Sequence, residues 1–182
     1  GALSGDLHVF AAASLSEAFT ELGAEFEADN PDARVTFTFA GSSALAEQIN
    51  QGAPADVFVP ADEASMAKVV DAGGAAGPRI IARNRPAILV ERDNPERITG
   101  LDDLSRSDLV LVLCAPEVPC GKVAAAALAK AEVRATPASL EENVKAVVSK
   151  VILGEADAGI VYVTDVRAVG DEAQGIEIDI AD

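Results

Sequence analysis

The chain has little of the material from which many enzyme sites are built. Its 182 residues include one histidine, one tyrosine and no tryptophan. With a single histidine, a histidine-rich metal site or a Ser-His-Asp catalytic triad is hard to assemble. Metal-dependent and serine-type hydrolysis are therefore disfavoured from the outset.

Positive charge and long apolar runs are also scarce. Acidic residues outnumber basic residues by 30 to 14, which gives a formal charge of −16. Such a charge repels nucleic acids and anionic membrane surfaces, so nucleic acid is not an expected partner. No apolar run approaches the roughly 20 residues of a membrane-spanning helix. Hydrophobic residues still make up 49% of the chain, which predicts a folded core rather than a disordered chain.

The two cysteines are too few for a zinc site, and they lie close together in the sequence. Cys114 and Cys120 flank a short proline-containing loop, a spacing that suits a structural disulfide. Such a bridge would place the protein in an oxidising compartment. The alternative is a thiol-dependent enzyme, because Cys120 precedes a helix expected to begin near Gly121, and a helix N-terminus lowers the pKa of a thiol.

Strand-like and helix-like segments alternate in the first part of the chain. Apolar strands are predicted at three places, 7–10, 35–39 and 56–59. Each strand is followed by small or hydroxyl residues and then by apolar residues at helical spacing. This order predicts an α/β fold whose first sheet is parallel.

The second part of the chain continues the alternation. Further strands are predicted at 87–90, 109–113, 158–163 and 176–180. Helical segments are predicted at 101–104, 121–133 and 140–152. The polar segment 83–86 marks a boundary, so we predict a first lobe at 1–82 and a second lobe from residue 83 to 175.

The strand-to-helix junctions are candidate anion sites. A helix N-terminus presents unpaired N–H groups and the positive end of the helix dipole. Ser14 and Ser42 stand at two such junctions, at the carboxyl ends of strands, where ligands of open α/β sheets bind. Taken alone, each serine is more readily explained as a helix cap than as an anion ligand. Further caps are expected at other junction residues, namely Ser16, Asp62, Thr164 and Asp165.

Six short motifs spread over nearly the whole chain: Val9-Phe-Ala-Ala-Ala-Ser-Leu15, Phe39-Ala-Gly-Ser-Ser-Ala-Leu45, Gln48-Ile-Asn-Gln-Gly-Ala-Pro-Ala-Asp-Val-Phe58, Pro60-Ala-Asp62, Val118-Pro-Cys-Gly121 and Gly154-Glu-Ala-Asp-Ala-Gly-Ile-Val-Tyr-Val-Thr-Asp165. In this order they resemble the molybdate-binding proteins of bacterial ABC importers. The Ala-Ala-Ser-Leu and Gln-Gly-Ala-Pro-Ala-Asp segments are specific to that family rather than to α/β folds in general.

The resemblance implies a two-lobed fold of the type II periplasmic binding proteins, in which each lobe is a mostly parallel sheet flanked by helices. It implies an extracytoplasmic substrate-binding protein, periplasmic or tethered as a cell-surface lipoprotein, that captures molybdate or tungstate between its lobes. The expected partner is the membrane permease of the importer. A monomer is expected, with no cofactor and no catalysis.

The resemblance also implies which residues donate hydrogen bonds to the oxyanion. The expected donors are the hydroxyls of Ser14, Ser42 and Tyr162 and the backbone N–H groups of Cys120, Val144 and Ala61. Molybdate is a fully deprotonated dianion at neutral pH, so a site of donors alone suits it. Sulfate carries the same charge, so pocket size must separate the two ions.

The chain departs from the family pattern at two places. The family usually has a small residue where this chain has Cys120, which leaves a backbone hydrogen bond feasible. Family members also continue past the strand predicted at 176–180 with a further strand and a helix that complete the first lobe. Residues 176–182 are therefore expected to begin a return to the first lobe.

Other functions stay open on the sequence alone. A receptor for sulfate would use the same kind of donors, whereas an iron receptor is disfavoured by the single tyrosine and single histidine. The effector domain of a transcription regulator shares the two-lobed fold, but the chain has no DNA-binding segment and a charge of −16.

Overall fold

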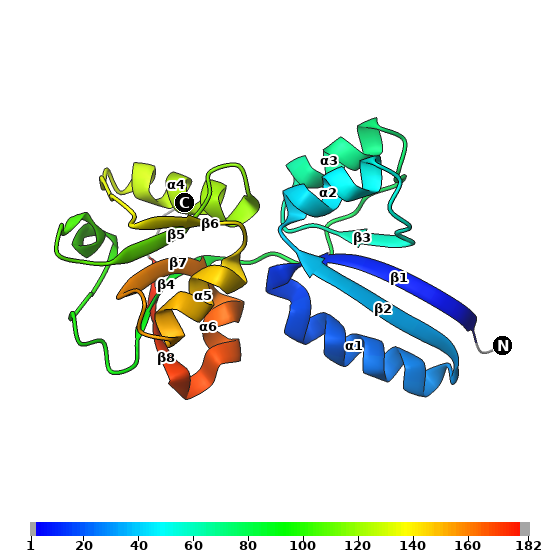
Figure 1. Ribbon diagram of the computed structural model, residues 1–182, viewed down its shortest axis with the longest axis horizontal. Coiled ribbons are helices and arrows are strands. Elements are labelled where there is room, and N and C mark those ends of the chain that lie inside the picture. The colour runs from blue at the N-terminus through cyan, green and yellow to red at the C-terminus, as the bar shows by residue number, and fades with distance from the viewer. Residues whose placement is uncertain (1–2, 179–182) are drawn as a thin grey trace. The chain divides into compact units, whose positions relative to one another are not determined.

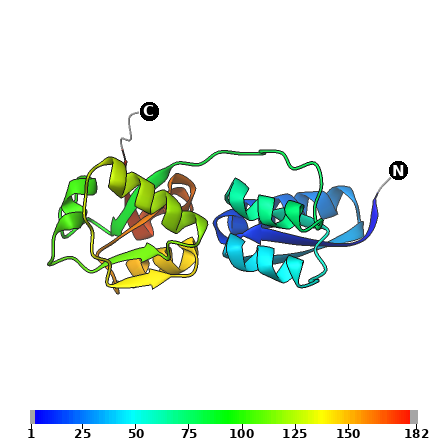
Figure 2. The same ribbon diagram turned by 90° about the horizontal axis from the view of Figure 1, so that it is seen from above.

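The structure, a computed structural model, describes residues 3–178. The chain divides into two compact units, Gly1–Ile81 and Ala82–Asp182, beside the boundary expected at 82/83. Residues 72–85, which join the last helix of the first unit to the first strand of the second, contain no helix or strand (Figures 1 and 2). Within residues 3–178, no helix combines the length and the apolar character needed to cross a bilayer.

The first unit is a three-stranded sheet with helices on both sides. Its elements are β1 (Ser4–Ala12), the 3₁₀ turn η1 (Ala13–Leu15), α1 (Ser16–Asp29), β2 (Asp32–Ala40), α2 (Ser42–Asn50), β3 (Val57–Val59) and α3 (Glu63–Asp71). The strand order is β2-β1-β3, and both pairings are parallel, which confirms the predicted parallel sheet. Helix α1 lies on one side of β1 and β2, and α2 and α3 lie on the other (Figure 1).

Small and aromatic residues bring α1 against β2. Phe19 of α1 meets Phe37 of β2 edge to face, with ring centroids 6.4 Å apart. Gly23 lies over the same ring, and a Cβ at this position would approach Phe37 Cε2 to 2.6 Å. The glycine thus lets the helix approach the aromatic ring closely enough to cover it.

The caps of the first unit agree with the prediction at one junction and differ at another. Asp62 caps α3 as predicted, because its Oδ1 accepts the Ser65 N–H at 2.8 Å. Neither Ser14 nor Ser16 caps α1, whose N-cap is Leu15 without a side-chain hydrogen bond. The 3₁₀ turn replaces that cap, since the Ala13 carbonyl accepts the Ser16 N–H.

The second unit contains a five-stranded sheet in the order β6-β5-β7-β4-β8. Its elements are β4 (Pro86–Glu91), the 3₁₀ turn η2 (Leu101–Ser105), β5 (Leu111–Cys114), α4 (Pro119–Lys130), β6 (Ser139–Glu141), α5 (Val144–Ile152), β7 (Ala158–Tyr162), α6 (Val163–Val169), the 3₁₀ turn η3 (Gly170–Glu172) and β8 (Ala173–Glu177). Strand β4 is antiparallel to both of its neighbours, and the other pairings are parallel. Two of the four pairings are thus parallel and two antiparallel, and four of the five strands run in the same direction, in agreement with the predicted mostly parallel sheet.

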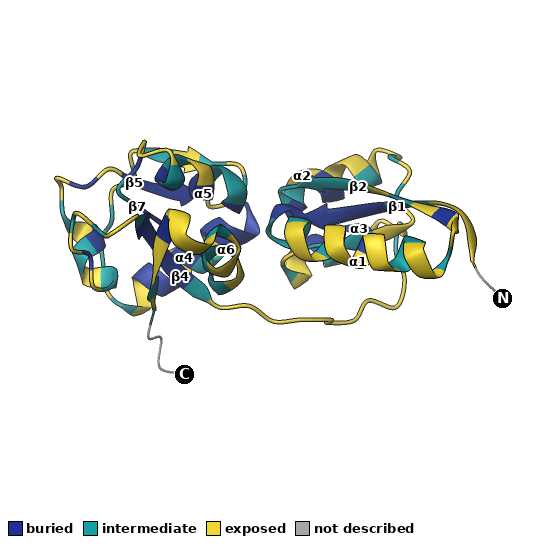
Figure 3. Cartoon of the chain, turned by 90° about the horizontal axis from the view of Figure 1, so that it is seen from below, coloured by how far each residue is buried: buried dark blue, intermediate teal, exposed yellow. Residues whose placement is uncertain are grey.

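Both faces of this sheet are covered, so its three inner strands β5, β7 and β4 are almost entirely buried (Figure 3). Alternate residues of β4 enter different clusters, with Leu89 on one face and Ile88 and Val90 on the other. The valines of α5 cover the first face, and Ala124 and Leu128 of α4 cover the second. Continuous apolar strands are the expected result of burial on both faces.

Two elements of the second unit differ from the sequence prediction. Leu140 lies in β6 rather than in α5 and is 55% exposed, because the helix begins only after Asn143. The last strand runs Ala173–Glu177 and pairs with β4, with Ile176 opposite Ile88. Residues 176–178 therefore belong to the second unit instead of beginning a return to the first, and 179–182 lie outside the described residues.

Cys114 and Cys120 form the predicted disulfide, which joins the end of β5 to the first turn of α4. Their Cα atoms are 5.7 Å apart. The chain has only these two cysteines, so the bridge uses both sulfurs. A bridged Cys120 has no thiolate, which removes the nucleophile that a thiol-dependent enzyme would need.

Replacing both cysteines by alanine should lower the free energy of unfolding by about 2 kcal/mol, because a bridge over six positions restricts the unfolded chain. Urea titration of the unreduced protein and the variant measures the difference. Wild type in excess dithiol should lose a similar amount. Equal urea midpoints for all three samples would show that the bridge does not stabilise the fold.

Candidate functional site

Ser14 and Ser42 lie at the same edge of the first sheet. Strands β1 and β2 pair in parallel with Ala12 opposite Ala40, and each serine follows two residues later. Ser14 is half-buried in η1, whereas Ser42 is 2% exposed and is the first residue of α2. The register of the two strands therefore places both hydroxyl-bearing junctions side by side.

Ser42 is held by the segment between β3 and α3 of the same unit, which contains Ala61. Its Oγ accepts the Ala61 N–H at 2.9 Å. A serine hydroxyl has one hydrogen and two lone pairs, so accepting from Ala61 leaves its hydrogen to donate elsewhere. The expectation that Ala61 offers its N–H to an oxyanion is corrected, because that N–H binds Ser42 instead.

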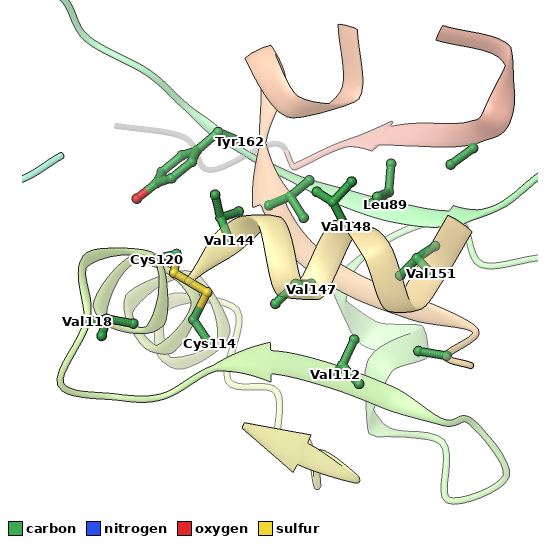
Figure 4. Close-up of a cluster of buried hydrophobic side chains, with 13 residues drawn as sticks. Leu89, Val112, Cys114, Val118, Cys120, Val144, Val147, Val148, Val151 and Tyr162 are labelled. Atoms are coloured by element: carbon green, nitrogen blue, oxygen red, sulfur yellow. A yellow bond between two sulfur atoms is a disulfide. The ribbon is translucent and has the colours of Figure 1, made fainter. Parts of the chain in front are cut away.

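Cys120, Val144 and Tyr162 meet in one buried cluster of the second unit. Figure 4 shows the Tyr162 ring, Val144 and the disulfide at one end of this cluster. Each residue stands at a helix start: Cys120 is the second residue of α4, Val144 the first of α5, and Tyr162 the N-cap of α6. Three residues that are far apart in the sequence are thus brought together.

The start of α4 is shaped by its glycine and proline. Pro119 occupies the first position and has no N–H, so the Cys120 N–H is the first donor of the helix, with no carbonyl of its own helix to bind. A Cβ at Gly121 would overlap the Ala115 carbonyl oxygen, which itself accepts the Val118 N–H at 3.1 Å. The disulfide and this close approach fix the loop that presents Cys120.

The start of α5 is set by Asn143. Its side-chain Oδ1 accepts the Ala146 N–H at 3.1 Å, and its backbone is extended with φ of −158°. Val144 follows at the first helical position, where its N–H has no carbonyl within the helix. Its side chain is buried in the cluster, so only its backbone can serve a ligand. Asn before an apolar run is an N-cap signal that the sequence analysis missed.

Tyr162 ends β7 and is 7% exposed. Its backbone N–H donates to Asp165 Oδ2 at 3.0 Å. The predicted cap at Thr164 and Asp165 is right only for Asp165: Tyr162 is the N-cap, and Asp165, the third helical residue, forms a capping box with it. Lys145, next to Val144, places its Nζ 3.3 Å from Asp165 Oδ1.

The two lysines of α5, Lys145 and Lys150, each pair with a carboxylate. Lys150 of α5 donates to Glu141 Oε1 at 2.6 Å, and this bond, with that of the Ser139 hydroxyl, lowers the pKa of Glu141. Within residues 3–178, no three His, Cys, Asp or Glu side chains gather as a metal site would require. The candidate residues supply neutral donors, which suits an anion rather than a cation.

Comparison with known proteins identifies the family. The model of the bacterial extracellular solute-binding proteins matches residues 7–180. The chain belongs to this family. Together with the relatives described next, this match confirms the resemblance drawn from the sequence motifs.

Individual relatives agree with the family assignment. The molybdate-binding protein ModA of Mycobacterium tuberculosis H37Rv is 48% identical over 162 residues, which are 88% of this chain and 62% of the relative. The chain thus spans about three-fifths of the length of that protein.

Solved structures agree with the predicted fold class. The periplasmic molybdate-binding protein of Azotobacter vinelandii has a TM-score of 0.72 at 22% identity, covering 88% of this chain and 72% of that one. The sulfate-binding protein SubI of M. tuberculosis has a TM-score of 0.79 at 18% identity, covering 95% and 71%. At these identities the likeness concerns the fold alone.

Gly121→Ala should destabilise the protein by about 1–3 kcal/mol, because the new methyl group overlaps the Ala115 carbonyl and must displace the start of α4. Urea unfolding measures the loss. Gly100→Ala is the matched control: φ is −176° there and no atom lies within 4 Å of the added Cβ, so its change should stay within about 0.5 kcal/mol. Equal effects of the two variants would contradict the close approach.

Proposed function

We propose that this protein is the substrate-binding component of a bacterial ABC importer and that it binds molybdate or tungstate. The observation that carries the proposal is the meeting of Cys120, Val144 and Tyr162 at three helix starts. The 48% identity to mycobacterial ModA over most of the chain supports the same ligand.

The proposed chemistry is hydrogen bonding by neutral donors. The proposed donors to the oxygens of a tetrahedral dianion are the hydroxyls of Ser14 and Ser42 in the first unit. In the second unit they are the Tyr162 hydroxyl and the N–H groups of Cys120 and Val144. Helix N-termini favour negative charge through their unpaired N–H groups and dipole. None of these donors is acidic enough to transfer its proton to the dianion, so the ion binds fully deprotonated.

Sulfate is the second candidate ligand. It is also a tetrahedral dianion at neutral pH, so the same donors accept it and only the size of the site distinguishes it from molybdate. The fold likeness to SubI is compatible with either ion. Molybdate and tungstate are nearly the same size, and we propose that both bind.

The proposed setting follows from the family and the disulfide. Disulfides persist in oxidising compartments, so the Cys114–Cys120 bridge supports an extracytoplasmic location, periplasmic or tethered as a lipoprotein. The proposed partner is the membrane permease of the importer, to which the chain delivers its ion as a monomer. The proposed role is binding, without catalysis or a cofactor.

Millimolar molybdate or tungstate should raise the melting temperature strongly, whereas sulfate should not. A ligand at about 1,000 times its dissociation constant stabilises a folded protein by about 4 kcal/mol. Thermal unfolding with each ion in parallel measures the effect. No shift with any oxyanion, in a protein that melts cooperatively, would overturn the proposed function. A shift with sulfate alone would reassign the ligand.

Tyr162→Phe should weaken molybdate binding by roughly 10- to 100-fold, because a hydrogen bond to a charged group is worth about 1.5–3 kcal/mol. Calorimetric titration measures the affinity. Ser14→Ala should have a comparable effect on affinity. Ser42→Ala should also lower the free energy of unfolding by about 1–3 kcal/mol, since the Ala61 N–H loses its acceptor. Unchanged affinity in all three variants would rule these hydroxyls out as donors.

A further inference from the structure

Asp165 is the one acidic side chain that is buried within residues 3–178, with a residue exposure of 1%. Burying a carboxylate costs several kcal/mol unless it is paired and hydrogen-bonded. Replacing such a pair by apolar residues is often neutral or stabilising, so stability alone is a weak reason for its presence. Its contacts indicate what else it does.

The two carboxylate oxygens of Asp165 hold two different helix starts. Oδ2 accepts the backbone N–H of Tyr162 at 3.0 Å, at the start of α6. Oδ1 lies 3.3 Å from Nζ of Lys145, which directly follows Val144 at the start of α5. One buried carboxylate therefore connects the backbone of Tyr162 with the segment that carries the Val144 N–H.

We propose that Asp165 and Lys145 are positioning residues that fix the Tyr162 hydroxyl and the Val144 N–H relative to each other for oxyanion binding. This proposal rests on the proposed function of the same site. Asp165 does not itself bind the ion, because a carboxylate repels a dianion. Lys145 offsets that negative charge, so the donors meet the ion in a locally neutral environment.

The direction in which one substitution changes the molybdate affinity separates positioning from simple electrostatics. Asp165→Asn keeps an oxygen that can accept the Tyr162 N–H but removes the charge that faces Lys145. If Asp165 acted only through its negative charge, its loss would strengthen anion binding. If it positions the donors, the same change weakens molybdate binding by about 10-fold or more, as losses of supporting contacts do at other sites.

The single tyrosine supplies an independent readout. The chain has one tyrosine and no tryptophan, so tyrosine fluorescence and the tyrosine band in near-ultraviolet circular dichroism report Tyr162 alone. Asp165→Asn should change this band in the ion-free protein and weaken its response to molybdate. A purely structural role would lower the melting temperature and leave the affinity of the folded protein unchanged.

Lys145 variants complete the experiment. Lys145→Met should weaken molybdate binding, whereas Lys145→Arg should keep most of the wild-type affinity. The double variant, Lys145→Met with Asp165→Asn, should bind molybdate no more weakly than the weaker of the two single variants, because the effects of contacting residues are not additive. Lys145→Met alone does not separate the two explanations, because the loss of a positive charge also weakens anion binding. The double variant leaves the net charge unchanged, so simple electrostatics predicts near wild-type affinity for it, whereas positioning predicts weaker binding.

Glu141→Gln is the matched control. It removes the carboxylate that pairs with Lys150, the other lysine of α5, whose Nζ binds Glu141 Oε1 and Ser139 Oγ. Its molybdate affinity should stay within about 2-fold of wild type. If wild type binds molybdate and both Asp165→Asn and Lys145→Met bind it as tightly or more tightly, the positioning role is overturned and the proposed function stands. Failure of wild type to bind any oxyanion overturns both.

Discussion

A helix start leaves backbone N–H groups without carbonyl partners, and the candidate site depends on how each start in this fold meets that constraint. At α3 a side-chain carboxylate takes the N–H, at α5 an asparagine does so, and at α1 a 3₁₀ turn supplies a carbonyl. The start of α6 is closed by Asp165. The N–H groups of Cys120 and Val144 remain at the first turns of α4 and α5, where the proposed oxyanion binds.

The sequence predicted the parts of the fold that depend on local periodicity. The alternation of apolar strands and helical segments was enough to predict a parallel first sheet, whereas the mostly parallel second sheet was implied by the family resemblance. Local rules failed where two patterns overlapped. Leu140 fits the helical spacing of α5, but Asn143 is extended and starts the helix three residues later. Ser14 looks like a cap, yet a 3₁₀ turn makes the cap unnecessary.

The contacts that shape the candidate site could not be predicted in the same way, because they join residues far apart in the chain. Ser42 and Ala61 are 19 positions apart, and Asp165 meets Lys145 from a different helix. In the sequence Asp165 is an ordinary acidic residue in the first turn of a helix, and nothing local indicates that it is buried. The family resemblance implied which residues donate hydrogen bonds, but it did not indicate that Ala61, Asp165 and Lys145 support them.

Neutral donors explain why positioning matters in an acidic protein. At physiological salt, charges more than about 8 Å away are largely screened, so the overall charge of −16 acts weakly on an ion inside the site. Lys145 and Lys150, the two lysines of α5, each pair with a carboxylate. In the proposed site the ion is therefore held by neutral donors and not by a lysine of this helix. Affinity is then divided among several directional hydrogen bonds, each of modest strength. A donor displaced by about 1 Å leaves hydrogen-bond distance and loses most of its contribution. In the proposed site this explains why a buried carboxylate is kept beside the donors despite the free energy that its burial costs.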